Sequence, residues 1–184
     1  MNESETIWVR YTWDLHDFNP DLSIPAGYNF RSVAHAEIGQ AIDVVLSAYR
    51  SDPVWRPLMT GIEQRLTERI LTTLEMPDTD YLAAEWGGRL TAISGVAKSH
   101  WTGQNLLTGV CVLPSHQRQG LGKYLLGLSL RRLHEMGLRR ACVYTENGSL
   151  ADRKVYPLFG SVREENVEYP GVQPSNNSFN PSPR

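Results

Sequence analysis

The stretch that decides the fold is VCVLPSHQRQGLGKYLL, which spans residues 110–126. It begins as an apolar, β-branched run, passes through Pro114 into polar residues, and then opens a leucine-rich segment with Gly120 and Gly122. This pattern predicts a buried strand that ends near Val112, a polar loop, and a helix that begins at the two glycines.

A helix that starts on glycines directly after a strand is suited to binding an anion. Its first amides have no partners inside the helix, and the helix dipole makes this end partly positive. Glycines also remove the Cβ atoms that would keep a bulky anion away. This arrangement favours main-chain binding of a phosphate or pyrophosphate, with Arg118 and Lys123 adding charge, although the glycines alone fit a tight strand-to-helix turn equally well. The loop is neither a Walker loop nor a dinucleotide fingerprint, because Leu125 stands where the third glycine would fall.

The segments around this loop predict an α/β fold with a mixed, mostly antiparallel sheet and helices on both faces. Apolar residues at helical spacing indicate two amphipathic helices before Pro77, and Gly87-Gly88 indicates a hairpin. A strand on each side of the glycine-led helix implies one parallel pair. The expected strands cover residues 6–15, 28–33, 80–86, 89–101, 105–113, 139–146 and 161–170.

Composition limits the class of protein. The 184 residues suit one domain, expected at 1–169, followed by a Pro/Ser/Asn-rich tail at 170–184 that is expected to be disordered. A net charge of −2 disfavours a nucleic-acid partner.

The absence of a signal-like or membrane-length apolar run predicts a cytoplasmic protein with no membrane partner. The histidines and cysteines show no metal-ligand spacing, so no metal site is expected. The aromatic first strand leaves pairing with a second subunit, and hence a homodimer, open.

Two motifs together resemble those of the GNAT acyltransferase superfamily. The first runs from Val110 to Gly122 as V-x-V-x-P followed by Q-x-x-G-x-G, and it resembles the family's acyl-coenzyme A (acyl-CoA) signature. The second is VYPLFG at residues 155–160, in which Tyr156 follows an aliphatic residue and precedes Gly160 by four positions. The resemblance implies a GNAT-like acyl-CoA-binding fold.

The resemblance covers roughly residues 80–162 and departs from the family pattern in two places. The asparagine often found seven residues before the tyrosine is replaced by Ser149, with Asn147 two residues further back. The aromatic residue that often follows the second-motif glycine is replaced by Ser161. The first difference bears on cofactor contacts and the second on packing, and neither removes the tyrosine.

The resemblance implies an N-acyltransferase that uses acetyl-CoA and acts on a primary amine, either a small molecule or a peptide. A main-chain amide near Val110 would stabilise the thioester oxygen, and Tyr156 would act as the general acid. Gly109 is either a bulge beside the ligand or a small residue in a crowded core. The implied cofactor-binding residues are Val110, Val112, Gln117, Arg118, Gln119, Gly120, Leu121, Gly122 and Lys123.

The general base is less well defined by the sequence. Glu85, at the end of a predicted hairpin strand, is the catalytic candidate, and His100 and Glu146 are alternatives. Three aromatic residues are candidates for lining an acceptor pocket: Tyr49, Trp55 and Trp101. Two other functions stay open, namely a non-catalytic acyl-CoA-binding or sensor module and a nucleotide-phosphate-binding protein of another fold.

Overall fold

The computed structural model describes residues 6–170, so most of the tail expected at 170–184 lies outside the described residues. Strands and helices alternate along the chain much as the sequence predicts. In chain order they are β1 (Trp8–Asp14), β2 (Asn29–Ser32), α1 (Ile38–Ser51), α2 (Met59–Thr73), β3 (Thr79–Trp86), β4 (Arg89–Ala97), β5 (Leu106–Val112), α3 (Leu121–Glu135), β6 (Arg140–Glu146), α4 (Leu150–Lys154) and β7 (Val162–Glu165).

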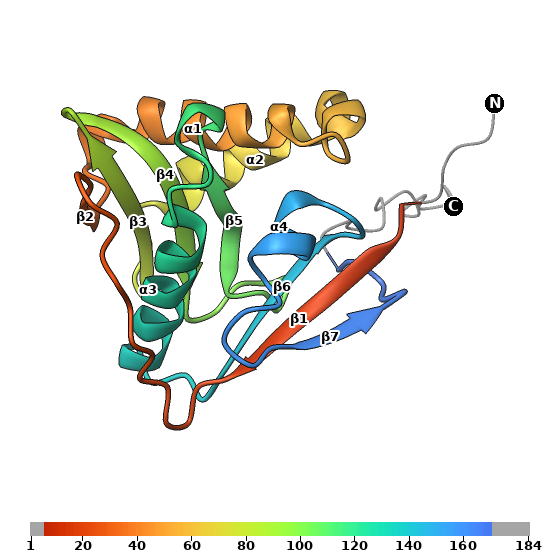
Figure 1. The fold of residues 1–184 in the computed structure, drawn as a ribbon. Coiled ribbons are helices and arrows are strands. Elements are labelled where there is room, and N and C mark those ends of the chain that lie inside the picture. Colours follow the sequence, from red (N-terminus) through yellow and green to blue (C-terminus); the bar gives the residue numbers. More distant parts are fainter. Residues whose placement is uncertain (1–5, 171–184) are drawn as a thin grey trace, which may run out of the picture.

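The strands form two sheets, seen apart from one another in Figure 1. One has the order β2-β3-β4-β5 and the other β6-β1-β7, and every pair within them is antiparallel. The predicted α/β fold with mostly antiparallel strands is thereby confirmed. Within the chain, β6 pairs along the whole of β1 and β7 pairs along residues 9–12, so most of β1 already has a neighbour on each side.

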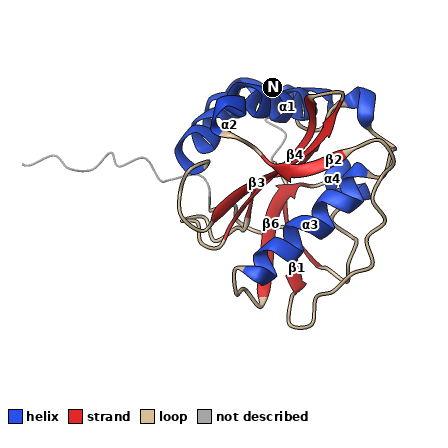
Figure 2. Ribbon diagram, turned by 90° about the vertical axis from the view of Figure 1, so that its left-hand side faces the viewer, coloured by secondary structure: helices blue, strands red, loops and turns tan. Residues whose placement is uncertain are grey.

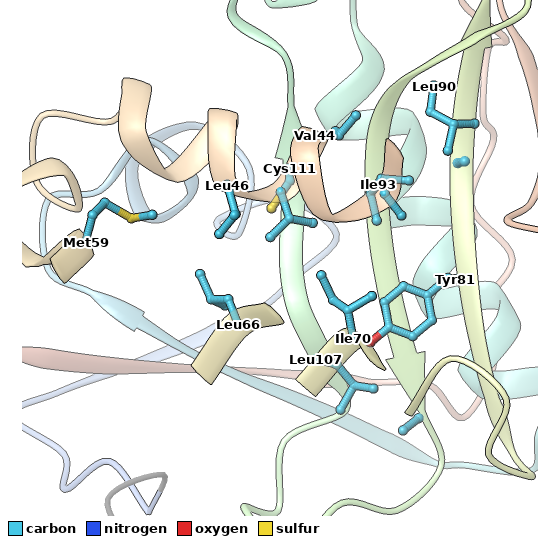
Figure 3. Packing of buried hydrophobic residues seen from close by; sticks show 14 residues of the cluster. Val44, Leu46, Met59, Leu66, Ile70, Tyr81, Leu90, Ile93, Leu107 and Cys111 are labelled. Carbon is cyan, nitrogen blue, oxygen red and sulfur yellow. The ribbon is translucent and has the colours of Figure 1, made fainter. Parts of the chain in front are cut away.

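Helices cover both faces of the larger sheet (Figure 2). Side chains of α1 and α2, such as Val44 and Ile70, pack on one face against Ile93 and Leu107 (Figure 3). On the other face, Leu125 and neighbouring residues of α3 pack against β3 and β4. No helix in residues 6–170 combines the length and apolar character needed to cross a membrane.

The parallel pair expected between the strands on either side of α3 is reduced to one residue. The Asn105 amide donates to the Cys142 carbonyl over 2.8 Å, and the Cys142 amide donates to the Asn105 side chain over 3.0 Å. Beyond Asn105, no backbone hydrogen bond joins β5 to β6 in the described residues, and the two strands belong to different sheets. The two strands therefore part where the site described below begins.

Gly109 lies at a bulge in β5. Its φ of 68° is in the left-handed region, and the register of β4 against β5 shifts between Ser94 and Val96. A Cβ atom at this position would lie 2.5 Å from the Oη atom of Tyr156. Gly109 therefore lies at a bulge and in crowded surroundings, and its approach to a ligand stays a prediction.

Candidate active site

Three hollows follow one another along β5. The loop cleft lies beside the 114–120 loop and the start of α3, the tyrosine cavity lies between β5 and β6, and the aromatic cavity lies between β5 and α2. The loop cleft and the tyrosine cavity share Val110 and Gln117 among their lining residues. The tyrosine and aromatic cavities share Tyr49 and Gly109. The three hollows therefore adjoin one another along β5, and we refer to them together as the passage.

The loop cleft brings together eight of the nine cofactor-binding residues predicted from the sequence. The ninth, Gln119, is exposed and does not line the cleft. The eight that do are Val110, Val112, Gln117, Arg118, Gly120, Leu121, Gly122 and Lys123.

The backbone conformation of the loop leaves the amides of residues 118–120 free to donate hydrogen bonds to a ligand. Arg118 and Gly120 adopt positive φ values of 61° and 80°, and Gly120 caps α3 without a side-chain hydrogen bond. Within residues 6–170, the amides of Arg118, Gln119 and Gly120 donate to no protein acceptor. Successive unpaired amides in such a turn form a concave site for an anion.

Three cations add to this positive end. Arg118, Lys123 and Lys154 line the cleft, and none of them forms an ion pair with a carboxylate in the described part of the chain. Their charge is therefore available to an anionic ligand. The residues present fit the diphosphate of CoA.

Tyr156 reaches the centre of the passage from the loop after α4. It is 2% exposed, and the Val110 amide donates to its Oη atom over 3.4 Å. The rings of Tyr11 and Trp13 pack against it at centroid distances of 5.6 and 5.9 Å. Burial raises the pKa of Tyr156 above its ordinary value, so the hydroxyl keeps its proton at neutral pH.

Asp52 is the one carboxylate among the described residues that line the tyrosine cavity. It follows α1 and is 5% exposed, and its two oxygens accept the amides of Val54 and Leu150 over 2.9 and 2.7 Å. Sequence reasoning missed Asp52 because the segment SDP signals the end of a helix. The signal that could have found it is an acidic residue placed next to the aromatic candidates Tyr49 and Trp55.

Glu85, predicted as the catalytic base, lies elsewhere. Its carboxylate pairs with Arg31 over 2.6 Å, because β3 places it beside β2, and it does not line the tyrosine cavity. We therefore correct the assignment. His100 is also outside this cavity, hydrogen-bonded to Thr102 over 2.6 Å. Glu146 is not among the lining residues either, although burial raises its pKa to about 7.

Two of the three aromatic candidates line the cavities, and the third does not. Tyr49 and Trp55 line both the tyrosine and the aromatic cavity. Trp101 is 60% exposed and lines neither of them. Three further aromatic residues of the aromatic cavity were not anticipated, because they come from distant segments: Trp8, Tyr144 and Tyr169.

Comparisons with solved structures find the same fold in proteins of low identity. A GCN5-related N-acetyltransferase from Sphaerobacter thermophilus is 17% identical (TM-score 0.57; 89% of this chain, 53% of that one). A GNAT-family acetyltransferase from Colwellia psychrerythraea is 16% identical (TM-score 0.59; 88% and 54%). AAC(6')-Iy, in complex with the bisubstrate analogue CoA-S-monomethyl-acetylneamine, is 16% identical (TM-score 0.52; 72% and 89%). No curated protein matches the sequence.

The chain spans about half the length of the first two of these structures. A match of the amino-acid sequence to a protein family is stronger evidence of membership than similarity of fold at low identity. Residues 45–160 match the acetyltransferase (GNAT) family, and this match includes the loop, β5, β6 and Tyr156. A nucleotide-phosphate-binding protein of another fold is thereby excluded. The chain belongs to the GNAT family of acetyltransferases.

Proposed function

We propose that this protein transfers the acetyl group of acetyl-CoA to a primary amine. The observation that carries the proposal is the row of three adjoining hollows along β5, from the loop cleft to the aromatic cavity, with Tyr156 lining the middle one. A donor held at one end and an acceptor held at the other would meet beside the tyrosine hydroxyl. Holding two reactants in one orientation is itself a large part of catalysis.

The loop cleft is the proposed CoA site. The free amides of the 118–120 turn and the charges of Arg118, Lys123 and Lys154 would hold phosphate oxygens. The parting of β5 from β6 leaves backbone groups of β5 facing a cavity instead of a neighbouring strand. The amide groups of a pantetheine arm would pair with that free edge.

When bound, acetyl-CoA supplies an activated acyl thioester. The Val110 amide points into the tyrosine cavity, where it would donate to a carbonyl oxygen that gains negative charge. Tyr156 holds its proton on Oη and would deliver it to a departing thiolate. A thiol has an ordinary pKa near 8.5 and a phenol one near 10, and the thiolate would depart into the same buried surroundings that raise the pKa of Tyr156, so both groups would favour their neutral forms there.

Asp52 replaces Glu85 as the proposed residue for holding the acceptor's ammonium and receiving its proton. For Asp52→Asn we expect kcat/KM for the amine to fall by about 10- to 100-fold, with unchanged CoA affinity. The readout is kcat/KM for the amine across a pH series, measured for both proteins. A parallel melting curve is needed, since Asp52 also accepts the Val54 and Leu150 amides. An unaltered profile in a folded variant would remove the role.

Isothermal titration with CoA, followed by a thiol-release assay over a panel of amines, tests the proposal directly. We expect Lys123→Gln to weaken CoA binding by about 5- to 20-fold, because it removes one charge-assisted contact. Lys98→Gln is the matched control, since Lys98 is exposed and outside the cleft. Equal affinities for both variants would argue against the loop cleft as the binding site.

The same pair of measurements separates catalysis from the alternative of a CoA-binding sensor. A sensor would bind CoA at the loop cleft and release no thiol with any amine.

A further inference from the structure

The aromatic cavity is walled by five rings that contact one another in sequence. Centroid distances are 5.1 Å from Tyr49 to Trp55, 5.7 Å from Trp55 to Trp8, 4.2 Å from Trp8 to Tyr169 and 5.7 Å from Tyr169 to Tyr144. These residues come from α1, β1, β6 and the segments after α1 and β7. Such a wall suits an apolar or aromatic body.

Two arginines on successive turns of α2 line the same cavity. Arg69 donates to the Leu107 carbonyl over 2.8 Å and to the Tyr169 hydroxyl over 3.1 Å, and Arg65 donates to the Gly61 carbonyl over 3.2 Å. In the described part of the chain, no carboxylate lies within 4.0 Å of either guanidinium. No acidic residue is among those that line this cavity in residues 6–170. The two charges are therefore not neutralised locally.

The side-chain amide of Gln104 is a further donor in this cavity, and it lacks a hydrogen-bond acceptor within residues 6–170. Its side chain is 3% exposed and lines the cavity, and its Nε2 atom is buried without any hydrogen-bond partner within residues 6–170. A buried amide donor without an acceptor is costly unless a ligand supplies one. Arg65, Arg69 and Gln104 all present donors, so the group that complements them is an acceptor with negative charge.

The electrostatic effect of Arg69 extends beyond its own contacts. The pKa of His100 is lowered first by burial and then by the charge of Arg69. Positive potential at this end of the passage agrees with the absence of a paired carboxylate. An acceptor with several positive charges would be repelled here.

From this arrangement we infer that the acceptor is a primary amine that also carries a carboxylate and an apolar body. The inference rests on the proposed function. Its carboxylate would lie between Arg65, Arg69 and Gln104, its apolar part against the five rings, and its amine beside Gly109 and Tyr156.

The spacing along β5 suggests the length of this acceptor. Arg69 contacts the Leu107 carbonyl, and Gly109, which touches the Tyr156 hydroxyl, is two residues further along the strand. Two residues of strand span roughly 7 Å. The amine and the carboxylate of an extended dipeptide are separated by about this distance. A dipeptide with apolar side chains is therefore the probe that fits best.

The test compares leucyl-phenylalanine with its C-terminal amide in the thiol-release assay, with neamine as a polycationic probe. We expect kcat/KM to be at least about tenfold higher for the free acid than for the amide. Arg65→Gln and Gln104→Met should each reduce that preference by about five-fold or more, through a lower kcat/KM for the free acid. Arg140→Gln is the matched control, because Arg140 is an exposed arginine outside the cavity.

A second measurement does not depend on turnover. Calorimetric binding of N-acetyl-leucyl-phenylalanine, which has no free amine, should weaken by about five-fold or more in Arg65→Gln, and its C-terminal amide should bind poorly to every variant. Thiol release with equal rates for acid and amide, or a preference for neamine, would overturn this inference and leave the proposed function standing. Failure of CoA to bind would instead overturn the proposed function, and the blocked peptide would still report on the cavity.

Discussion

Replacing Tyr156 with phenylalanine is expected to lower kcat by about 100- to 1,000-fold, because the variant keeps the ring and loses the proton that a departing thiolate needs. The ring packs against Tyr11 and Trp13, so the shape of the cavity should be preserved. The hydroxyl accepts only a long hydrogen bond from the Val110 amide, so the free energy of unfolding should change little. Steady-state kinetics and a CoA titration provide the measurement.

The matched control for this variant is Tyr81→Phe. Tyr81 is also buried, and its hydroxyl is hydrogen-bonded to Thr73 over 2.7 Å, away from the passage. Removing that hydroxyl should cost about 1 kcal/mol of stability and leave kcat unchanged. Unchanged kcat for Tyr156→Phe, or a loss explained by weaker CoA binding, would contradict the proposed acid role.

Gly109→Ala is the second substitution for which we expect a large effect, on both stability and turnover. The left-handed φ of 68° strains any residue with a Cβ atom, and that atom would lie 2.5 Å from the Tyr156 hydroxyl. We expect a loss of roughly 2–4 kcal/mol in the free energy of unfolding and a fall in kcat of about 100-fold, since the hydroxyl must move. Chemical denaturation and steady-state kinetics measure the two effects.

Gly103→Ala isolates the backbone contribution. Gly103 has a φ of 76° and open space around its Cβ position, so this variant should lose only about 1 kcal/mol. The clash itself is tested by adding Gly109→Ala to Tyr156→Phe, because phenylalanine has no hydroxyl to displace. The alanine should then cost markedly less stability than in the wild-type background. Equal costs in both backgrounds would show that Tyr156 is not the group in contact.

Much of the fold could be predicted because its signals are local. The apolar run before Pro114 and the glycines after it are sufficient to place β5, the loop and α3, and Gly87-Gly88 marks the hairpin of β3 and β4. The loop cleft follows from the same stretch, since a strand, a turn and a helix start are consecutive in the sequence. Gln119 alone among the nine predicted residues does not line the cleft, and its part in cofactor binding stays a prediction.

The parts that could not be predicted depend on which distant segments meet. Nothing in the sequence of β3 shows that Arg31 would neutralise Glu85. The parting of β5 from β6 depends on pairing within two separate sheets, whereas a strand–helix–strand order suggests an ordinary parallel pair. The aromatic cavity joins Trp8 to Tyr169 across almost the whole described chain.

The alignment of the three hollows along one strand has a kinetic consequence. The only thiol among the described residues lining the tyrosine cavity is Cys111, and burial raises its pKa, so this cavity offers no ready thiolate to carry an acyl group in transit. In the proposed reaction, both reactants would then have to be present at once. Because they would occupy opposite ends, neither would obstruct the route by which the other arrives or departs.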